Sequence, residues 1–192
     1  MTTITRNTNE TQIELALDLY SDAGADIESP VPFLNHMLTL FARHAGVGLR
    51  VRATGDTEID GHHTVEDIGI TLGQAISGAL GEKKGIARYG DALIPMDEAL
   101  VLCALDISGR GHLSFDAAFP TQRVGAFDLE LVEEFFTALV RSAGITLHLK
   151  QMAGKNSHHI AEACFKAFAH AFRKALEKTG DARVLSTKGV LE

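Results

Sequence analysis

The chain has 192 residues, of which 45% are hydrophobic and 22% charged, as in an ordinary soluble globular protein. Its net charge of −7 excludes a general binder of nucleic acid or of an anionic membrane surface, because such proteins carry a basic field. The two cysteines, Cys103 and Cys164, stand far apart in apolar segments, and no apolar run is long enough to span a membrane. We therefore expect a cytoplasmic protein with reduced thiols.

The pattern of apolar residues predicts strands that alternate with helices. A period of two predicts a strand and a period of 3.6 predicts a helix. In chain order, the first half is expected to contain a strand, a helix, a strand and a helix, at 12–19, 32–45, 47–54 and 64–80. The second half repeats this order with one additional strand, at 100–107, 112–119, 129–143, 145–152 and 158–178. Gly46 and Gly144 follow the first helix of each half, where glycine commonly ends a helix.

Similarity between the two halves indicates an internal duplication. Residues 10–19 align with 98–107, for example, and similar pairs follow along the chain. We place the first repeat half at 1–92 and the second at 93–192. Each half-domain is rich in strands and has two helices, which predicts an α+β fold. We expect two β-sheets with the helices packed between them, so that the halves form one compact domain.

One five-residue pattern, His-His-x-x-Glu, occurs in both halves, at 62–66 and 158–162. On a helix the first His and the Glu are i, i+4 and the second His and the Glu are i, i+3, so all three can point near one surface. Imidazole and carboxylate ligands without sulfur suit Mn, Fe or Zn and argue against a structural zinc site. His36 aligns with Glu134, so each half offers one metal-binding group from its first helix and three from its second. The pattern predicts two metal ions with four protein ligands each.

Several short motifs occur in a fixed order along nearly the whole chain. They are Arg6-Asn-Thr-Asn-Glu-Thr11, Phe33-Leu-Asn-His-Met-Leu38, Asp60-Gly-His-His-Thr-Val-Glu-Asp67, Pro95-Met-Asp-Glu98, Gly154-Lys-Asn-Ser-His-His-Ile-Ala-Glu-Ala163 and Ser186-Thr-Lys-Gly189. Together with the duplication, they resemble the imidazoleglycerol-phosphate dehydratase family of histidine biosynthesis. Asn35 stands where many members have Asp, and Glu134 stands where some have His.

The resemblance implies a lyase that dehydrates imidazole glycerol phosphate to imidazole acetol phosphate, with the substrate imidazole held as an imidazolate at a dinuclear site. It implies two Mn²⁺ per active site, although Fe or Zn would suit the same ligands. It further implies a homo-oligomer of 24 chains with the metal sites at subunit interfaces. On this resemblance one metal takes His36, His63, His158 and Glu162. The other takes His62, Glu66, His159 and, by repeat symmetry, Glu134.

The substrate contacts also come from the resemblance. It implies that Glu10 contacts the substrate, and we expect this carboxylate to be the base that removes a proton from the glycerol tail. A phosphate bound by an acidic protein needs local cations, of which Arg suits bidentate contact and Lys supplies a point charge. The expected substrate-binding residues are Glu10, His44, Arg88, Arg110, Lys166, Ser186 and Lys188. A histidine at the position of His44 equally suits a structural role at the C-terminus of its helix.

Two other functions would use the same metal ligands. A dinuclear hydrolase with a bridging water would explain the His and Glu residues, but not Glu10 or the cations Arg88, Arg110 and Lys188. A metal-storage or metal-assembled shell protein would assemble with metal but show no turnover, and it would have no use for Glu10. A dehydratase assay before and after metal removal separates these alternatives.

Overall fold

The computed structural model describes residues 1–21, 23–181, 183–187, 189 and 191. The elements of the first half are β1 (Thr2–Asn7), β2 (Thr11–Asp18), β3 (Ala25–Glu28), α1 (Pro32–Ala45), β4 (Gly48–Gly55) and α2 (His62–Leu80). Those of the second half are β5 (Tyr89–Met96), β6 (Ala99–Asp106), β7 (His112–Asp116), β8 (Arg123–Val124), β9 (Phe127–Asp128), α3 (Glu130–Ala143), β10 (Thr146–Ala153) and α4 (Ser157–Ala175).

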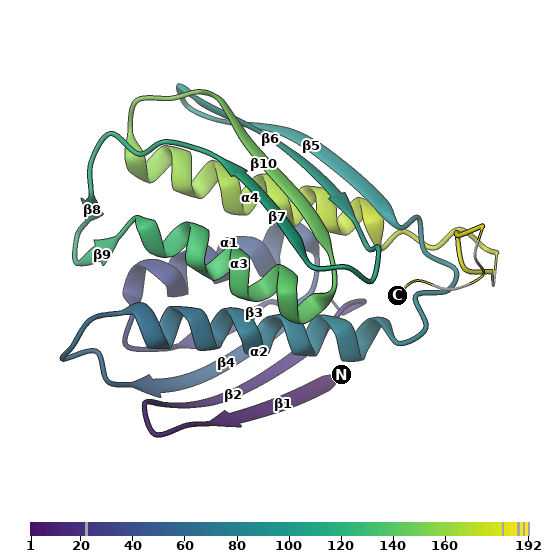
Figure 1. Ribbon diagram of the computed structural model, residues 1–192, viewed down its shortest axis with the longest axis horizontal. Helices are drawn as coiled ribbons and strands as arrows, with labels where there is room; N and C mark the ends of the chain where they lie inside the picture. Colours follow the sequence, from purple (N-terminus) through teal and green to yellow (C-terminus); the bar gives the residue numbers. More distant parts are fainter. Residues whose placement is uncertain (22, 182, 188, 190, 192) are drawn as a thin grey trace.

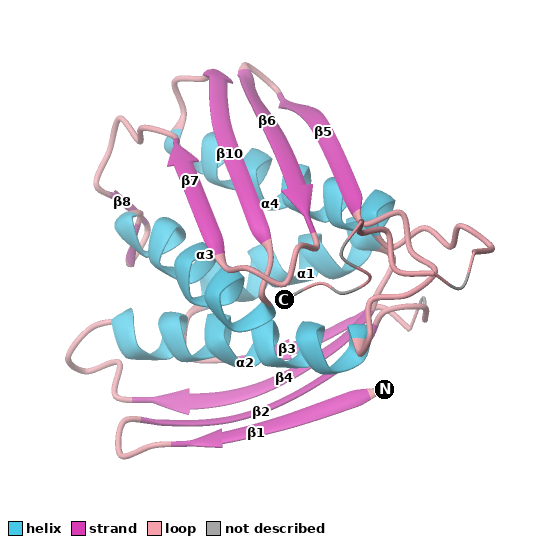
Figure 2. Cartoon of the chain, turned by 45° about the vertical axis from the view of Figure 1, so that its right-hand side comes forward, coloured by secondary structure: helices cyan, strands magenta, loops and turns pink. Residues whose placement is uncertain are grey.

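Two four-stranded sheets form the outer layers, and the four helices lie between them (Figure 1). The sheet orders β1-β2-β4-β3 and β5-β6-β10-β7 are the same topology used twice. In each sheet the last pair, β3 with β4 or β7 with β10, is parallel and the other pairs are antiparallel. Figure 2 shows the two sheets on opposite sides of the helical layer. The predicted α+β fold with two similar halves is confirmed.

The strands follow the expected alternation because each sheet has only its inner face against the helices. In β2, Ile13, Leu15 and Leu17 are buried, whereas Gln12 and Glu14 between them are exposed. Strand β6 repeats the pattern with its buried side chains at alternate positions, Val101, Cys103 and Leu105. One-sided burial of this kind is typical of an antiparallel sheet with one face toward the solvent.

The first helix of each half ends as predicted. Gly46 has φ 69° and ψ 44°, and Gly144 has φ 66° and ψ 44°, both in the left-handed region that glycine adopts without steric cost. The backbone N–H of Val47 then donates to the carbonyl of Ala42, which satisfies one of the last carbonyls of α1. Pro32 begins α1, where its missing N–H costs nothing.

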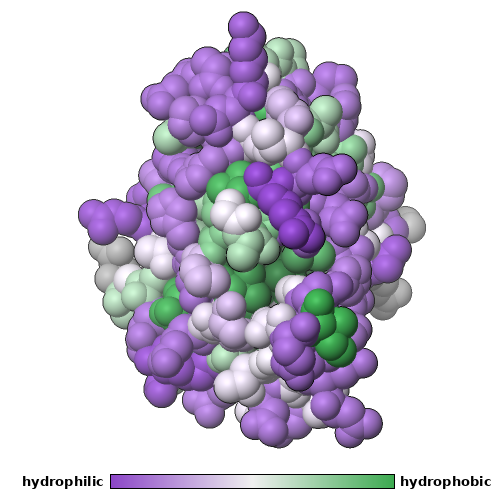
Figure 3. Space-filling model, turned by 90° about the vertical axis from the view of Figure 1, so that its left-hand side faces the viewer, coloured by the Kyte–Doolittle hydropathy of each residue, from purple (hydrophilic) through white to green (hydrophobic). Residues whose placement is uncertain are grey.

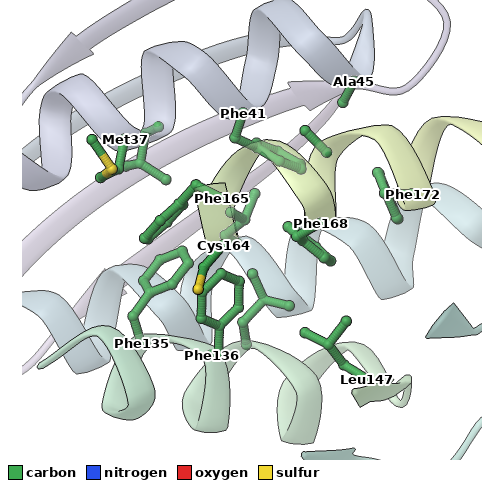
Figure 4. Packing of buried hydrophobic residues seen from close by; sticks show 14 of the residues in the cluster. Met37, Phe41, Ala45, Phe135, Phe136, Leu147, Cys164, Phe165, Phe168 and Phe172 are labelled. Atoms are coloured by element: carbon green, nitrogen blue, oxygen red, sulfur yellow. The ribbon is translucent and has the colours of Figure 1, made fainter. Parts of the chain in front are cut away.

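Aromatic side chains from three helices fill the centre of the molecule (Figure 4). Phe41 of α1 stacks on Phe168 of α4, with ring centroids 5.2 Å apart. Phe136 of α3 packs against Phe165 of α4 at 4.8 Å. The residues with helical spacing on these helices are all buried, namely Met37, Phe41, Phe135, Phe136, Phe165 and Phe168. This shared core joins the two halves into one body.

Several element boundaries differ from the predictions. The last helix, expected over 158–178, ends at Ala175, because the chain beyond it turns back to form a β-bridge between Ile86 and Lys178. The strand expected over 112–119 ends at Asp116. Strands β1, β3 and β5 were not predicted. Their sequences obscure them, since β1 is rich in Thr, β3 has four residues, and β5 contains a glycine and a proline.

Two further expectations concern the chain as a whole. Strand β5 spans Tyr89–Met96 and pairs with β6, so it crosses the boundary at 92/93 that the sequence repeat suggests. Cys103 and Cys164 are free and buried, and burial raises the pKa of both thiols, that of Cys164 to about 12. Among the described residues, no helix is both long and apolar enough to cross a membrane.

Candidate metal centre and substrate site

The first candidate metal group joins α1 to the first turns of α4. Its members are His36, His158 and Glu162, whose ligand atoms all lie within 4.8 Å of one another. Nε2 of His158 is 3.3 Å and Nε2 of His36 is 3.6 Å from Oε2 of Glu162. The Asn156 side chain caps α4 by accepting from the backbone N–H groups of His158 and His159. The cap sets the start of the helix, so the His-His-x-x-Glu pattern begins in its first turn.

Glu162 is the buried member of this group, with 6% of its surface exposed. Burial opposes ionisation of its carboxyl group, but the hydrogen bond and charge of Lys166, with His36 and His158, outweigh that effect and hold its pKa below the ordinary value. Nζ of Lys166 lies 2.6 Å from Oε1 of Glu162. The carboxylate is therefore ionised at neutral pH, as a metal ligand must be.

The second group is the counterpart of the first in the duplication. His62 and Glu66 stand one turn apart at the start of α2, and Glu134 comes from α3, again with all ligand atoms within 4.8 Å of one another. The carboxylate of Asp60 accepts from the backbone N–H of His62 at 2.8 Å, near the helix N-terminus. Each group thus takes two residues from the second helix of one half and one from the first helix of the other.

His63 and His159 do not join these groups within the chain. As neighbours of His62 and His158 on a helix, they point about 100° away. Nδ1 of His63 is 3.0 Å from Oδ2 of Asp56, and Nδ1 of His159 is 2.7 Å from Oε2 of Glu98. These hydrogen bonds are the main reason that the pKa of each imidazole is raised. Of the eight expected ligands, the chain therefore brings six together in two sets of three.

Glu10, the expected base, lies in the turn between β1 and β2. Its carboxylate is half exposed, and Oε2 lies 3.8 Å from Nδ1 of His63. The turn is held by Thr8, whose hydroxyl accepts from the backbone N–H groups of Glu10 and Thr11. Behind it, the buried carboxylate of Asp67 accepts from the Thr11 hydroxyl at 2.5 Å and pairs with Arg6 at 2.8 Å. This network attaches the Glu10 turn to α2.

Three of the expected phosphate contacts line one cavity of about 1170 Å³, namely Arg88, Arg110 and Ser186. Arg88 has φ 71° and pairs with Asp106 at 2.7 Å, which raises its pKa further. Arg183 also lines this cavity, but it pairs with Asp181, which lines the cavity too, and Arg88 pairs with Asp106. These guanidinium groups can still donate hydrogen bonds to an anionic group. Lys188 falls outside the described residues.

His44 and Lys166 are not among the residues that line that cavity. His44 on α1 faces His170 on α4, with ring centroids 5.1 Å apart. Burial is the main cause that lowers the pKa of His44, followed by the charges of His170 and Lys166. Lys166 is engaged with Glu162 and also reaches Sδ of Met96. Lys166 therefore stands beside the first metal group, whereas His44 lies about two turns farther along α1, against His170.

Sequence reasoning did not select Asp56 and Glu98 as site residues, although both lie in polar motifs. Two signals were available. Glu98 aligns with Glu10 in the repeat, and Asp56 directly follows β4 just before the His-His-x-x-Glu helix. Both carboxylates bond to a histidine of the duplicated pattern.

All four helices begin at one end of the molecule, on the left in Figure 1, so both metal groups lie toward that end. Figure 3 shows this end face-on, with an apolar area among polar side chains. Two large apolar residues precede the helices that carry the His motifs, Ile59 before α2 and Met152 before α4. They are 69% and 56% exposed, respectively.

Comparison with known proteins identifies the family. A model of the imidazoleglycerol-phosphate dehydratase family matches residues 29–172. Imidazoleglycerol-phosphate dehydratases of Desulforamulus reducens and Geobacter sulfurreducens are 54% and 55% identical to the chain, covering 97% and 98% of it and 95% and 97% of their own length.

Solved structures agree with the sequence matches. The enzyme of Staphylococcus aureus superposes with a TM-score of 0.83 at 44% identity, covering 93% of this chain and 99% of its own. That of Pyrococcus furiosus, in complex with (S)-C348, gives 0.85 at 40% identity, covering 98% of this chain and 100% of its own. The chain belongs to the imidazoleglycerol-phosphate dehydratase family.

Proposed function

We propose that this chain dehydrates imidazole glycerol phosphate to imidazole acetol phosphate in the histidine biosynthesis of the cytoplasm. The family match supports the reaction class. The observation that carries the proposal is the pair of His and carboxylate groups, each assembled from both halves of the chain. A ligand with two ring nitrogens, such as imidazole, suits a site with two metal ions.

The donor atoms of the two groups fit such ions. Imidazole nitrogens and carboxylate oxygens without thiolate suit Mn²⁺, with Fe or Zn as other candidates. The first group is His36, His158 and Glu162, and the second is His62, Glu66 and Glu134. We propose that His63 and His159 complete these sets from other copies of the chain, in a homo-oligomer of 24 subunits. The apolar area at the end where the helices begin supports an interface there.

Base catalysis alone would be slow on this substrate, because the tail proton is not next to a carbonyl group. Bound metal ions would favour loss of the single N–H proton of the substrate imidazole, and the electron-rich ring could then expel the neighbouring hydroxyl group. Glu10 removes the tail proton with its half-exposed carboxylate, 3.8 Å from His63. The enol that results then tautomerises to the ketone.

The substrate phosphate binds at the cavity lined by the arginines. Arg88 lies at the C-terminal end of α4, whose first turns carry a metal group, so this cavity would act with the metal groups of another copy of the chain. Arg88 and Arg110 contact its oxygens there, and Ser186 adds a hydroxyl donor. Arg88 is held in place by Asp106, which fixes the direction of its guanidinium group. Lys166 contacts the substrate beside the first metal group, His44 contacts it farther along α1, and Lys188 supplies a further cation.

The experiment is a dehydratase assay on imidazole glycerol phosphate before and after metal removal, with the molecular mass of the assembly measured in parallel. Formation of imidazole acetol phosphate, lost on chelation and restored by Mn²⁺, supports the proposal. Release of inorganic phosphate instead would indicate a dinuclear hydrolase. Metal-dependent assembly without turnover of this substrate would indicate a storage or shell protein.

A further inference from the structure

The two histidines outside the metal groups share one arrangement. Nδ1 of His159 is 2.7 Å from Oε2 of Glu98, and Nδ1 of His63 is 3.0 Å from Oδ2 of Asp56. An ionised carboxylate only accepts hydrogen bonds, so Nδ1 of each ring must carry the proton. Nε2 of each ring is then the nitrogen with the free electron pair, and it is the atom that would bind a metal ion.

Backbone N–H groups hold the carboxylate of Glu98 directly, whereas Asp56 is held through its own backbone and its Oδ1 is buried without a hydrogen-bond partner among the described residues. Oε1 of Glu98 accepts from the N–H groups of Lys155 at 3.1 Å and Asn156 at 2.7 Å, in the loop before α4. Its other oxygen is thereby directed at His159. In the first half, the N–H of Asp56 donates to the carbonyl of Glu10 at 3.2 Å, which joins the end of β4 to the Glu10 turn.

The two halves obtain this carboxylate from different positions. Glu98 immediately precedes β6 and is the counterpart of Glu10, which immediately precedes β2. Asp56 immediately follows β4, and its counterpart after β10 is Gly154. Gly154 has φ 139°, and a Cβ there would lie 2.8 Å from Cγ1 of Ile160, so no carboxylate fits at this position. The second half uses the residue that precedes its strand instead.

We infer that Glu98 and Asp56 are positioning residues, which hold His159 and His63 in the tautomer that leaves Nε2 available to a metal ion. Glu98 is therefore not a second base, although it is the repeat counterpart of the proposed base. Because Asp56 orients His63, Glu10 stays at 3.8 Å from that ring and remains available to the substrate. Glu10 and Glu98 occupy equivalent positions in the two halves but have different roles, because Glu10 acts as the base and Glu98 orients a histidine. The inference rests on the metal use in the proposed function.

Glu98→Gln is the sharpest test. Its single amide oxygen must serve the N–H groups of Lys155 and Asn156, so its NH₂ group faces Nδ1 of His159 and forces the ring proton to Nε2. The expected result is a roughly 10- to 100-fold weaker affinity for one of the two Mn²⁺ ions, with the other unchanged. Asp56→Ala, which removes the hydrogen-bond acceptor at Nδ1 of His63, should weaken the other ion. Manganese titration of the metal-free protein measures both.

Asp97→Asn is the matched control. Oδ2 of Asp97 lies 3.7 Å from Nε2 of His159, so the variant removes one negative charge beside the same ring without touching the Nδ1 bond. It should keep both ions within about 3-fold of the wild-type affinity, well inside the effect expected of an outer-shell partner. An equal loss in Asp97→Asn and Glu98→Gln would show that only net charge matters, and would overturn the inference.

A second readout does not depend on metal or turnover. Solid-state NMR of metal-free protein with ¹⁵N-labelled histidine, assigned by comparison with His159→Gln, reports the tautomer of His159 directly. We expect Nδ1–H in the wild type and Nε2–H in Glu98→Gln. An unchanged tautomer would refute the positioning role even if the enzyme proves to be a dehydratase. If the protein binds no metal, the proposed function fails while this readout still decides the tautomer. Should Glu98→Gln misfold, Asp56→Ala tests the same role at His63.

Discussion

Nε2 of His36 lies 3.6 Å from Oε2 of Glu162, and these two residues belong to opposite halves of the duplication. Glu134 reaches His62 and Glu66 across the same junction in the opposite direction. Helix α1 packs on α4 and α2 packs on α3, so the crossing follows from the way the halves share a core. Neither half alone holds three of the expected ligands in one group.

The crossed arrangement predicts how ligand substitutions combine. His36→Gln and Glu162→Gln should each leave one Mn²⁺ per chain in place of two, because they remove ligands of one ion. The double variant should lose no more metal than either single one, whereas His36→Gln with His62→Gln should lose both ions. Metal analysis of the purified variants measures this, with His112→Gln as a control outside both groups. Loss of both ions from the His36/Glu162 double variant would contradict the assignment.

Metal removal should lower stability, since each proposed ion would link helices of the two halves. A ligand at a free concentration 100-fold above its dissociation constant adds about 2.7 kcal/mol. We expect chelation to lower Tm and added Mn²⁺ to restore it. Differential scanning calorimetry of the wild type and Glu162→Gln provides the measurement, and the variant should show a smaller shift. Equal Tm shifts in the wild type and Glu162→Gln would show that the stabilising ion does not bind at Glu162.

The close contact of α2 with α3 depends on glycine. A Cβ on Gly73 would lie 2.5 Å from the carbonyl oxygen of Leu139 and 2.7 Å from Cβ of Ser142. Gly73→Ala should therefore destabilise the fold by about 1–3 kcal/mol through overpacking. Gly78→Ala is the control in the same helix, because that position is exposed and meets only a methyl group of Thr2 at 3.2 Å. Chemical denaturation should show the control near or above wild-type stability, and equal losses would refute the steric explanation.

Helix boundaries were predictable where local chemistry decides them. Pro32 and Gly46 bracket α1 as expected, because proline favours a helix start and glycine tolerates the left-handed end. The limits of α4 were less predictable, since its end depends on the bridge to Ile86, a residue distant in sequence. Strand β3 is specified by its pairing with β4 more than by its own four residues.

The candidate site, like the element boundaries, was only partly predictable from the sequence. Helical spacing and the His36/Glu134 correspondence mark the candidate ligands in the sequence, and the family resemblance places three residues of each metal set together. The directions of His63 and His159 could not, since they depend on which carboxylate the folded loops bring to each ring.

Phosphate binding predicts a separation between substrate affinity and metal content. Arg110→Ala should raise KM by about 10-fold or more, the loss of a charge-assisted contact of about 1.5–3 kcal/mol, and leave two Mn²⁺ per chain. Arg141→Ala, which removes an exposed cation from α3, is the control. Steady-state kinetics with parallel metal analysis distinguishes the two effects. If Arg110→Ala loses metal in proportion to activity, the phosphate assignment is wrong.

Glu10 should be required for chemistry and dispensable for metal binding. Its carboxylate lies outside both metal groups and beyond hydrogen-bond distance of His63, so Glu10→Gln preserves size and polarity while removing the base. We expect kcat to fall by about 100-fold or more, the usual contribution of a general base, with both Mn²⁺ ions and Tm unchanged.

Glu98→Gln is the informative comparison, because Glu98 holds the equivalent place in the second half. Its defect should be relieved at high Mn²⁺ concentration, since the ion is bound weakly but the base is intact. The defect of Glu10→Gln should persist at any Mn²⁺ concentration. Full turnover by Glu10→Gln would exclude it as the base and direct attention to another carboxylate near the substrate tail.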